Sequence, residues 1–223
     1  MLPKNIANLE NRIHTAAASC GRRREDILVL AVTKKFPATV IREAHDLGLR
    51  DFGENYVQEF EDKRPVLGDL PGARFHLIGH LQSNKARKAA ELFDCIQTVD
   101  TPKLAERLSQ ARFTRARPMD VMVEVKLSPE QAKAGAAPEG LPALIEAIRA
   151  LPALRLRGLM TMPPWSDNPE HSRPYFAQLR RLGEQHRLPE LSMGMSHDLE
   201  VAIEEGATCI RIGTALFGPR PKP

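Results

Sequence analysis

Two lysines mark the end of an apolar run near the start of the chain. Residues 27–40 read ILVLAVTKKFPATV, so Lys34 and Lys35 follow what looks like a buried strand. An amine held in a partly dry pocket loses its charge more readily, and the neutral amine attacks aldehydes to form a Schiff base. A lone lysine at a strand end is more often simply solvated. Because successive strand residues point to opposite faces, we expect only one of the pair to enter a site.

An aldehyde ligand that carries a phosphate needs an anion site nearby, and two later segments offer one. Gly194 and Ser196 precede an expected helix over 197–206, and Gly213 with Thr214 follow the last apolar run. Backbone N–H groups at the start of a helix and glycines that allow close backbone approach both suit a phosphate. In the alternative interpretation, Ser196 only caps the helix and the glycines only form turns.

Arg211 and His76 are further candidates. Arg211 lies two residues before Gly213, so both share one face of the last strand, and its guanidinium suits a phosphate or a ring nitrogen. The alternative is an ion pair inside the fold. His76 suits a general base, a hydrogen-bond donor beside a cofactor, or a satisfied core histidine, and a lone histidine favours the last. We expect no metal site, because His80 belongs to the loop that follows His76.

Short apolar runs alternate with amphipathic helical patterns along the chain. Eight such strands in sequence favour parallel βα units that close into a single (βα)8 TIM-type barrel, although a doubly wound open sheet is also compatible. Catalytic and binding groups of a barrel gather at the carboxyl ends of its strands. The expected strands span residues 27–34, 50–55, 74–79, 95–100, 119–127, 155–162, 191–194 and 209–218.

The helical patterns lie between these strands, and one precedes them. Ile6, Leu9, Ile13 and Ala17 share one face of an extra N-terminal helix that ends before Gly21. The other expected helices span residues 37–48, 57–67, 83–93, 101–111, 141–151, 172–186 and 197–206. No linker or low-complexity block interrupts the alternation, so we expect one domain over residues 1–223.

Composition limits the remaining classes. The 223 residues carry a net charge of +4, but aromatic residues make up only 5% and no basic stripe is present, which disfavours nucleic-acid binding. The three cysteines (Cys20, Cys95, Cys209) lie far apart, which indicates neither a disulfide framework nor zinc and is compatible with a reducing cytoplasm. We expect no signal peptide and no membrane span.

Six blocks of the chain together resemble a known family. The blocks AVTKKFP, FGENYVQE, HLIGHLQSNK, GLMTM, LSMGMSHDLEVAIEEGAT and IRIGTALFG are similar to the signature blocks of the YggS/PROSC family, the pyridoxal phosphate homeostasis proteins. They occur in the family's order across nearly the whole chain. Because long and unusual strings match, the resemblance is specific.

This resemblance implies a barrel like the N-terminal domain of bacterial alanine racemase, with pyridoxal 5'-phosphate (PLP) at the carboxyl ends of the strands. The family's PLP-binding lysine follows AV[ST], which is Lys34 here, and Lys35 then points away. The other residues that the resemblance assigns to the cofactor are Ser196, Gly213 and Thr214 for the phosphate, Arg211 for the pyridine nitrogen, and Asn55, His76 and Met160 around the ring.

Whether such a protein turns over amino acids depends on groups beyond the lysine. A PLP racemase needs acid–base groups on both faces of the adduct, and in the racemase fold one comes from a second domain and the partner subunit. The sequence ends nine residues after Thr214, so we expect no second domain. An arginine beside the ring nitrogen would also weaken the ring as an electron sink. Both points favour a non-catalytic PLP carrier.

We therefore expect a cytoplasmic monomer that acts in vitamin B6 homeostasis, holds PLP as a Schiff base and has apo PLP enzymes as candidate recipients. Three alternatives stay open from the sequence. They are a PLP-dependent racemase of low activity, a cofactor-free Schiff-base aldolase, and an interaction scaffold whose lysines are incidental.

Overall fold

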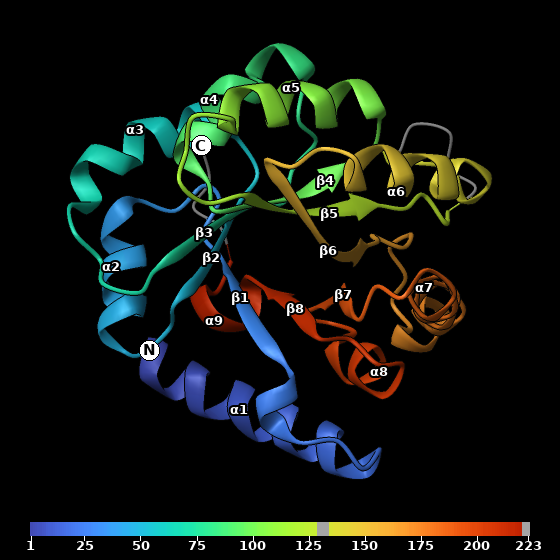
Figure 1. Ribbon diagram of the computed structural model, residues 1–223. Coiled ribbons are helices and arrows are strands. Elements are labelled where there is room, and N and C mark those ends of the chain that lie inside the picture. The colour runs from blue at the N-terminus through green and yellow to red at the C-terminus, as the bar shows by residue number, and fades with distance from the viewer. Residues whose placement is uncertain (129–133, 220–223) are drawn as a thin grey trace.

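Eight parallel strands close into a barrel in the computed structural model, which describes residues 1–128 and 134–219 (Figure 1). Neighbouring strands in sequence pair in parallel, and β8 pairs with β1. The predicted TIM-type barrel is confirmed, and the open sheet is excluded because the sheet has no edge. The strands are β1 (Leu28–Val32), β2 (Asp51–Glu54), β3 (Arg74–Leu77), β4 (Cys95–Val99), β5 (Met119–Glu124), β6 (Leu154–Met160), β7 (Glu190–Met195) and β8 (Cys209–Ile212).

Helices surround the barrel and cover the outer face of the strands (Figure 1). They are α1 (Leu2–Ser19), α2 (Ala38–Asp46), α3 (Val57–Leu67), α4 (Ala86–Leu92), α5 (Pro102–Arg112), α6 (Leu141–Arg149), α7 (Arg173–His186), α8 (Leu199–Glu204) and α9 (Thr214–Phe217). Short 3-10 helices add η1 (Arg24–Asp26), η2 (Ser83–Lys85), η3 (Pro138–Gly140) and η4 (Pro169–Ser172). None of the helices in the described ranges is both long enough and apolar enough to cross a bilayer.

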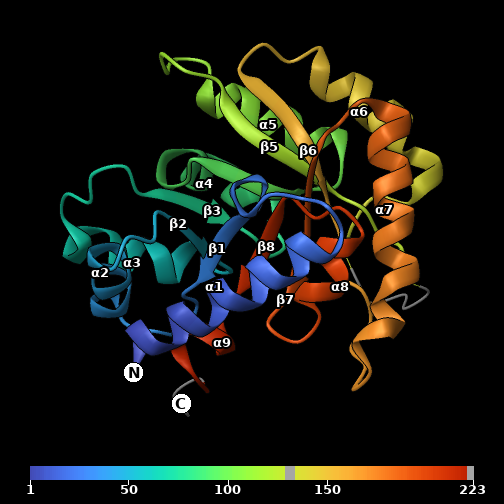
Figure 2. The same ribbon diagram turned by 90° about the horizontal axis from the view of Figure 1, so that it is seen from below.

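The N-terminal helix replaces the helix that would normally follow the eighth strand. In the residues described after β8, the one helix is α9, which has four residues and is too short to cover the barrel wall. The α1 helix packs against α8 and α9 instead, and Figure 2 shows it running along the barrel beside them. It buries Leu9, Ile13 and Ala17, three of the four residues whose spacing predicted its apolar face. The extra N-terminal helix is therefore confirmed, and it closes the gap beside β8.

The outer face of the barrel wall is packed with apolar side chains, which makes the strand ends a rigid frame. Phe60 of α3 stacks against Phe75 of β3 and Phe93 after α4, with ring centroids 4.7 and 4.8 Å apart. Phe52 of β2 extends the cluster to the next strand. Aromatic contacts of this kind bury large areas at fixed geometry. Helix α3 is thus locked to β2 and β3, which matters for the site at the ends of these strands.

Several expected elements are shorter in the structure than predicted, and two of the changed boundaries lie at the mouth of the barrel. The strand expected over residues 209–218 stops at Ile212, and its remainder forms the short helix α9. The helix expected over residues 197–206 begins at Leu199, with Asp198 at its N-cap position. A continuous apolar run does not reveal by its periodicity where a strand changes into a helix. Tertiary packing placed both boundaries.

Candidate PLP-type site at the mouth of the barrel

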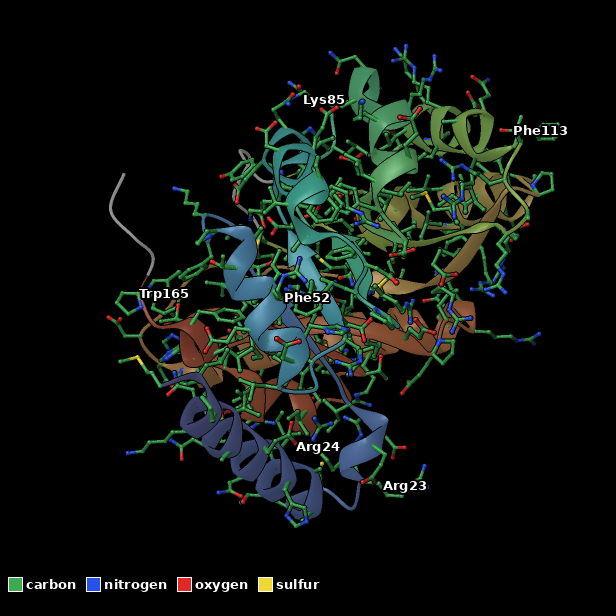
Figure 3. All side chains as sticks on the ribbon, turned by 90° about the vertical axis from the view of Figure 1, so that its left-hand side faces the viewer. Arg23, Arg24, Phe52, Lys85, Phe113 and Trp165 are labelled. Carbon is green, nitrogen blue, oxygen red and sulfur yellow. The ribbon has the colours of Figure 1, made fainter. Side chains whose placement is uncertain are left out.

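A cavity of about 580 Å³ lies at the carboxyl ends of the strands. Figure 3 views the barrel from the side, with Trp165 of the cavity rim at one end and Phe113 at the other. Six of the eight predicted cofactor residues line this cavity. They are Lys34, Asn55, Ser196, Arg211, Gly213 and Thr214.

The other two predicted cofactor residues do not line it. His76 points into a separate cavity at the amino ends of the strands, where its Nε2 lies 2.9 Å from Asp51 Oδ1. Met160 is 1% exposed within the barrel, and Met162, two residues later, reaches the mouth in its place. The structure thus separates His76 and Met160 from the other six residues, and their place around a cofactor stays a prediction.

A tight turn after β1 separates the two lysines. The strand ends at Val32, and the Phe36 N–H donates to the Thr33 carbonyl, 3.1 Å away. Lys35 has φ +65°, a left-handed conformation that is uncommon outside glycine, and its side chain is exposed, whereas Lys34 lines the cavity. The expected difference between the lysines is therefore present, but a turn causes it and strand alternation does not.

A buried lysine from α3 holds this turn in place. Lys63 is 8% exposed, and its Nζ donates to the Thr33 carbonyl at 3.0 Å and to Glu54 Oε1 at 2.7 Å. The same Nζ forms an ion pair with Glu59 Oε1 at 2.6 Å, and this oxygen accepts from the Lys35 backbone N–H at 2.6 Å. The buried ammonium thus has two hydrogen-bond acceptors and a second carboxylate beside it. Sequence reasoning missed Lys63, because nothing in the local pattern separates it from the other charged residues of α3.

Glu54 completes the buried cluster at the end of β2. Its Oε1 accepts from Lys63 and from the Thr33 hydroxyl, 2.8 Å away, and Glu54 is fully buried. Its Oε2 has no hydrogen-bond partner in the described residues. Burial raises the pKa of Glu54, and the charge and hydrogen bond of Lys63 oppose this shift. Lys63 is thus the main group that opposes the effect of burial on this carboxyl.

Arg211 forms the floor of the cavity. Its NH1 donates to Ser192 Oγ at 2.9 Å and its NH2 to the Thr161 carbonyl at 2.8 Å. Burial lowers the pKa of this guanidinium, which is 4% exposed. A guanidinium has five N–H hydrogens, so donors remain for a ligand in the cavity.

The β7–α8 and β8–α9 junctions meet at one wall of the cavity. Ser196 Oγ accepts from the Ala215 backbone N–H at 3.1 Å and so joins the two junctions. Gly194 has φ +89°, and a Cβ there would lie 2.4 Å from the Ala202 Cβ, so only glycine fits this approach of β7 to α8. In the described part of the chain, the Thr214 N–H donates to no recorded acceptor. Hydroxyls and amides together suit an anionic oxygen group.

Apolar side chains complete the lining of the cavity. Val32, Ile78 and Met162 line it, and Trp165 is 70% exposed at the rim with its ring centroid 4.9 Å from that of His197. Among the described residues, no group of three histidines, cysteines or acidic residues could hold a metal ion. The cavity therefore suits a flat organic ring that carries an anionic tail and a group reactive toward an amine.

Comparison with known proteins agrees with this geometry. Residues 5–221 match the family described as "Alanine racemase, N-terminal domain". A pyridoxal phosphate homeostasis protein of Pseudomonas aeruginosa is 50% identical over 221 residues, covering 98% of this chain and 96% of the relative. The chain belongs to the pyridoxal phosphate homeostasis proteins. A further member of this family, from Aquifex aeolicus, is 42% identical over 97% of both chains.

Solved structures of relatives show the same barrel. PipY of Synechococcus elongatus PCC7942 with PLP bound has a TM-score of 0.81 and 43% identity, covering 92% of this chain and all of that one. Alanine racemase of Clostridium difficile has a TM-score of 0.74 at 15% identity, covering 99% of this chain and 57% of that one. The racemase likeness shows a shared fold alone. The pyridoxal phosphate homeostasis family is thus built on the barrel that racemases also use.

We expect Glu54→Gln to change how stability depends on pH. Burial raises the pKa of Glu54, so the folded protein binds this proton more tightly than the unfolded chain. As pH falls through the raised folded-state pKa toward the ordinary value of 4.5, wild type should gain stability relative to the variant. Below that value the difference should be constant.

Urea unfolding across this pH range measures the effect, and Glu43→Gln makes the same change at an exposed position of α2 as a control. Parallel pH profiles for wild type and Glu54→Gln would contradict the argument.

Proposed function

We propose that this chain binds PLP at the mouth of the barrel, holds it as a Schiff base with Lys34, and serves PLP homeostasis without efficient turnover of amino acids. The observation that carries the proposal is one cavity that brings together a lysine amine, a buried arginine and a hydroxyl-and-amide wall. The names of the relatives and the PLP-bound PipY structure support the same ligand.

The residues present fit this cofactor. The Ser196 and Thr214 hydroxyls and the Thr214 N–H offer donors to the phosphate, and Gly213 keeps that wall free of a side chain. Asn55 Oδ1 is buried with no hydrogen-bond partner in the described residues, which is a cost unless a ligand or water meets the amide. A bound ligand that offers an O–H or N–H donor to this oxygen would remove that cost.

Lys34 supplies the covalent attachment. PLP, when bound, supplies an aldehyde for an amine and an electron-withdrawing ring. The Lys34 amine adds to the aldehyde carbon, and water leaves as the Schiff base forms. The Lys63 cluster fixes the Thr33 carbonyl and the Lys35 N–H on either side of Lys34, so the backbone of this residue is held before the ligand arrives. Fixed geometry of this kind lowers the entropic cost of attachment.

Arg211 argues against efficient catalysis. An arginine donates hydrogen bonds but gives up no proton at ordinary pH, so it favours a neutral ring nitrogen. A neutral ring accepts electrons less well and stabilises a carbanion poorly. Of the two tyrosines in the chain, Tyr56 is 51% exposed, and neither lines the cavity. The cavity lining therefore contains no tyrosine hydroxyl that could act as an acid or a base.

We further propose that apo PLP enzymes receive the cofactor and that the protein works as a cytoplasmic monomer. Trp165 and Met162 at the rim are exposed to solvent, which supports exchange because the cavity is open to solvent at this rim.

Attachment at Lys34 is tested by borohydride reduction of PLP-loaded protein and peptide mapping. We expect the label on Lys34 alone, because Lys34 lines the cavity and Lys35 is exposed beyond the turn. Lys34→Arg should abolish the label, and the matched variant Lys35→Arg should retain it. A label on Lys35, or equal labelling of both lysines, would be incompatible with the proposed geometry.

Anchoring by phosphate is tested by the double variant Ser196→Ala/Thr214→Ala. Hydrogen bonds to a charged group contribute about 1.5–3 kcal/mol each, so loss of both should lower the affinity for PLP by at least about a hundredfold. Pyridoxal lacks the phosphate and should lose little affinity. Equilibrium titrations with both ligands measure the effect, and equal losses would remove these residues from the phosphate site.

The carrier role is tested by mixing PLP-loaded protein with an apo PLP enzyme and, separately, with L- and D-alanine. We expect recovery of the apo-enzyme and slow change of chiral composition, because Arg211 disfavours a protonated ring. Racemisation at ordinary enzyme rates would refute the carrier role, and recovery no better than with free PLP would reduce the protein to a reservoir.

A further inference from the structure

A continuous set of buried hydrogen bonds leads from Arg211 across the interior of the barrel. Arg211 NH1 donates to Ser192 Oγ at 2.9 Å, and Ser192 Oγ lies 2.6 Å from Gln97 Oε1. Gln97 Nε2 lies 3.2 Å from His76 Nδ1, and His76 Nε2 lies 2.9 Å from Asp51 Oδ1. These five side chains come from β8, β7, β4, β3 and β2. We call this set the interior chain.

The interior chain is unusual for a barrel of this type. The inward-facing residues of such barrels are mostly Val, Ile and Leu. Here Ser192 is fully buried, Gln97 is 1% exposed, and His76 is 4% exposed. Burying polar groups brings no stability over well-packed apolar residues, and it costs stability wherever a partner is lost. A role other than folding therefore accounts better for this polar layer.

The two ends of the interior chain lie in different cavities. Arg211 lines the cavity at the mouth. His76 and Asp51 line a second cavity, of about 1210 Å³, at the amino ends of the strands. There Asp51 lies 3.8 Å from the guanidinium of Arg74, which also contacts Asp120. Figure 3 shows these two ends of the barrel, marked by Trp165 and Phe113.

Asp51 sets the direction of every hydrogen bond in the interior chain. A carboxylate oxygen accepts, so His76 Nε2 carries the hydrogen, and Nδ1 is the acceptor that faces Gln97 Nε2. Gln97 must then donate through Nε2, which turns its Oε1 toward Ser192. The Ser192 hydroxyl donates to this oxygen, and its lone pairs face Arg211.

Because the directions are linked, a change at His76 is passed along the interior chain. If Nδ1 instead of Nε2 carried the hydrogen, the Gln97 amide would have to turn over, and its nitrogen would then face Ser192. Ser192 then loses the acceptor for its hydroxyl hydrogen, and the hydroxyl must rotate beside Arg211. A buried element with two arrangements is the physical basis on which coupling between distant sites rests.

We propose that Gln97 and Ser192 are positioning residues, which hold the Arg211 guanidinium toward the mouth cavity while His76 and Asp51 fix the directions of their hydrogen bonds. Through the same hydrogen bonds, the cavity at the amino ends of the strands is coupled to the mouth cavity. The part of this proposal that concerns the PLP ring rests on the proposed function. The part that concerns how Arg211 is held in place does not.

The test uses two variants that touch neither Arg211 nor the mouth. Gln97→Leu removes the centre of the interior chain, and His76→Phe removes a link two side chains away from the arginine. Thr208→Val is the matched control: Thr208 lines the same end cavity as His76, but its hydroxyl bonds only to the Leu191 backbone. Arg211→Lys has no guanidinium at this position, so the N–H signals that disappear in its spectrum belong to Arg211.

The first measurement is the guanidinium N–H spectrum of the apo-protein by nitrogen NMR. In wild type and Thr208→Val, we expect Arg211 signals that exchange slowly with water. In Gln97→Leu and His76→Phe these signals should shift and exchange faster. Unchanged Arg211 signals in both variants would overturn the proposal.

The second measurement is the visible absorption band and release rate of bound PLP. Loss of one net hydrogen bond corresponds to about fivefold in affinity, so we expect a shifted band and about fivefold faster release in both variants. Altered Arg211 signals with an unaltered band and release rate would overturn the role at the cofactor. If wild type shows no band with PLP, the proposed function fails, and the apo-protein spectra alone decide the interior chain.

Thermal unfolding of each apo-protein confirms folding before either measurement. Should His76→Phe fail to fold, His76→Asn shortens the side chain while keeping it polar, and the same two outcomes apply to it.

Discussion

The buried ammonium of Lys63 is the interaction on which the mouth of the barrel depends. A charge removed from water needs several close partners, and here they come from the end of β1, the end of β2 and helix α3. Because the aromatic cluster around Phe60 locks α3 to the barrel wall, Lys63 fixes the Thr33 peptide relative to that wall. The direction of Lys34 thus follows from a contact thirty residues further along the chain.

Arg211 is a second buried cation at the cavity, and its partners are of a different kind. Its recorded partners are a hydroxyl and a carbonyl, and no carboxylate in the described residues forms an ion pair with it. Dipoles compensate a buried charge less completely than a carboxylate does, so burial lowers the pKa of this guanidinium. Such a group favours a ligand that brings lone pairs or negative charge, which agrees with a pyridine ring that carries a phosphate.

The barrel separates stability from chemistry by layer. The apolar side chains between the strands and the helices form the core. Part of the barrel interior is polar instead, and apolar residues could stabilise the fold equally well there. Alanine racemase at 15% identity shares this fold. Fold alone therefore says little about activity, and the residues at the strand ends and in the interior carry the functional argument.

The sequence by itself determined the alternation of strands and helices and favoured a closed barrel over an open sheet. Of the eight cofactor residues that it predicted, six line the cavity. These follow from local periodicity and from one geometric rule, because residues just after parallel strands meet at one end of a barrel. Lys34, Ser196 and Thr214 needed no knowledge of contacts to be placed there. Binding of PLP by these residues is a prediction that the proposed experiments address.

Only the tertiary structure decided that His76 faces the cavity at the amino ends of the strands and that Met162, not Met160, lines the mouth cavity. It also showed the buried hydrogen bonds of Lys63 and Gln97. Register shifts between neighbouring strands, as between β7 and β8, alter which side chains reach the mouth, and no local pattern records them. Gln97 and Ser192 are 95 residues apart in sequence yet share a hydrogen bond. Contacts of that separation arise from the closure of the whole barrel, so they become visible only once all eight strands are in place.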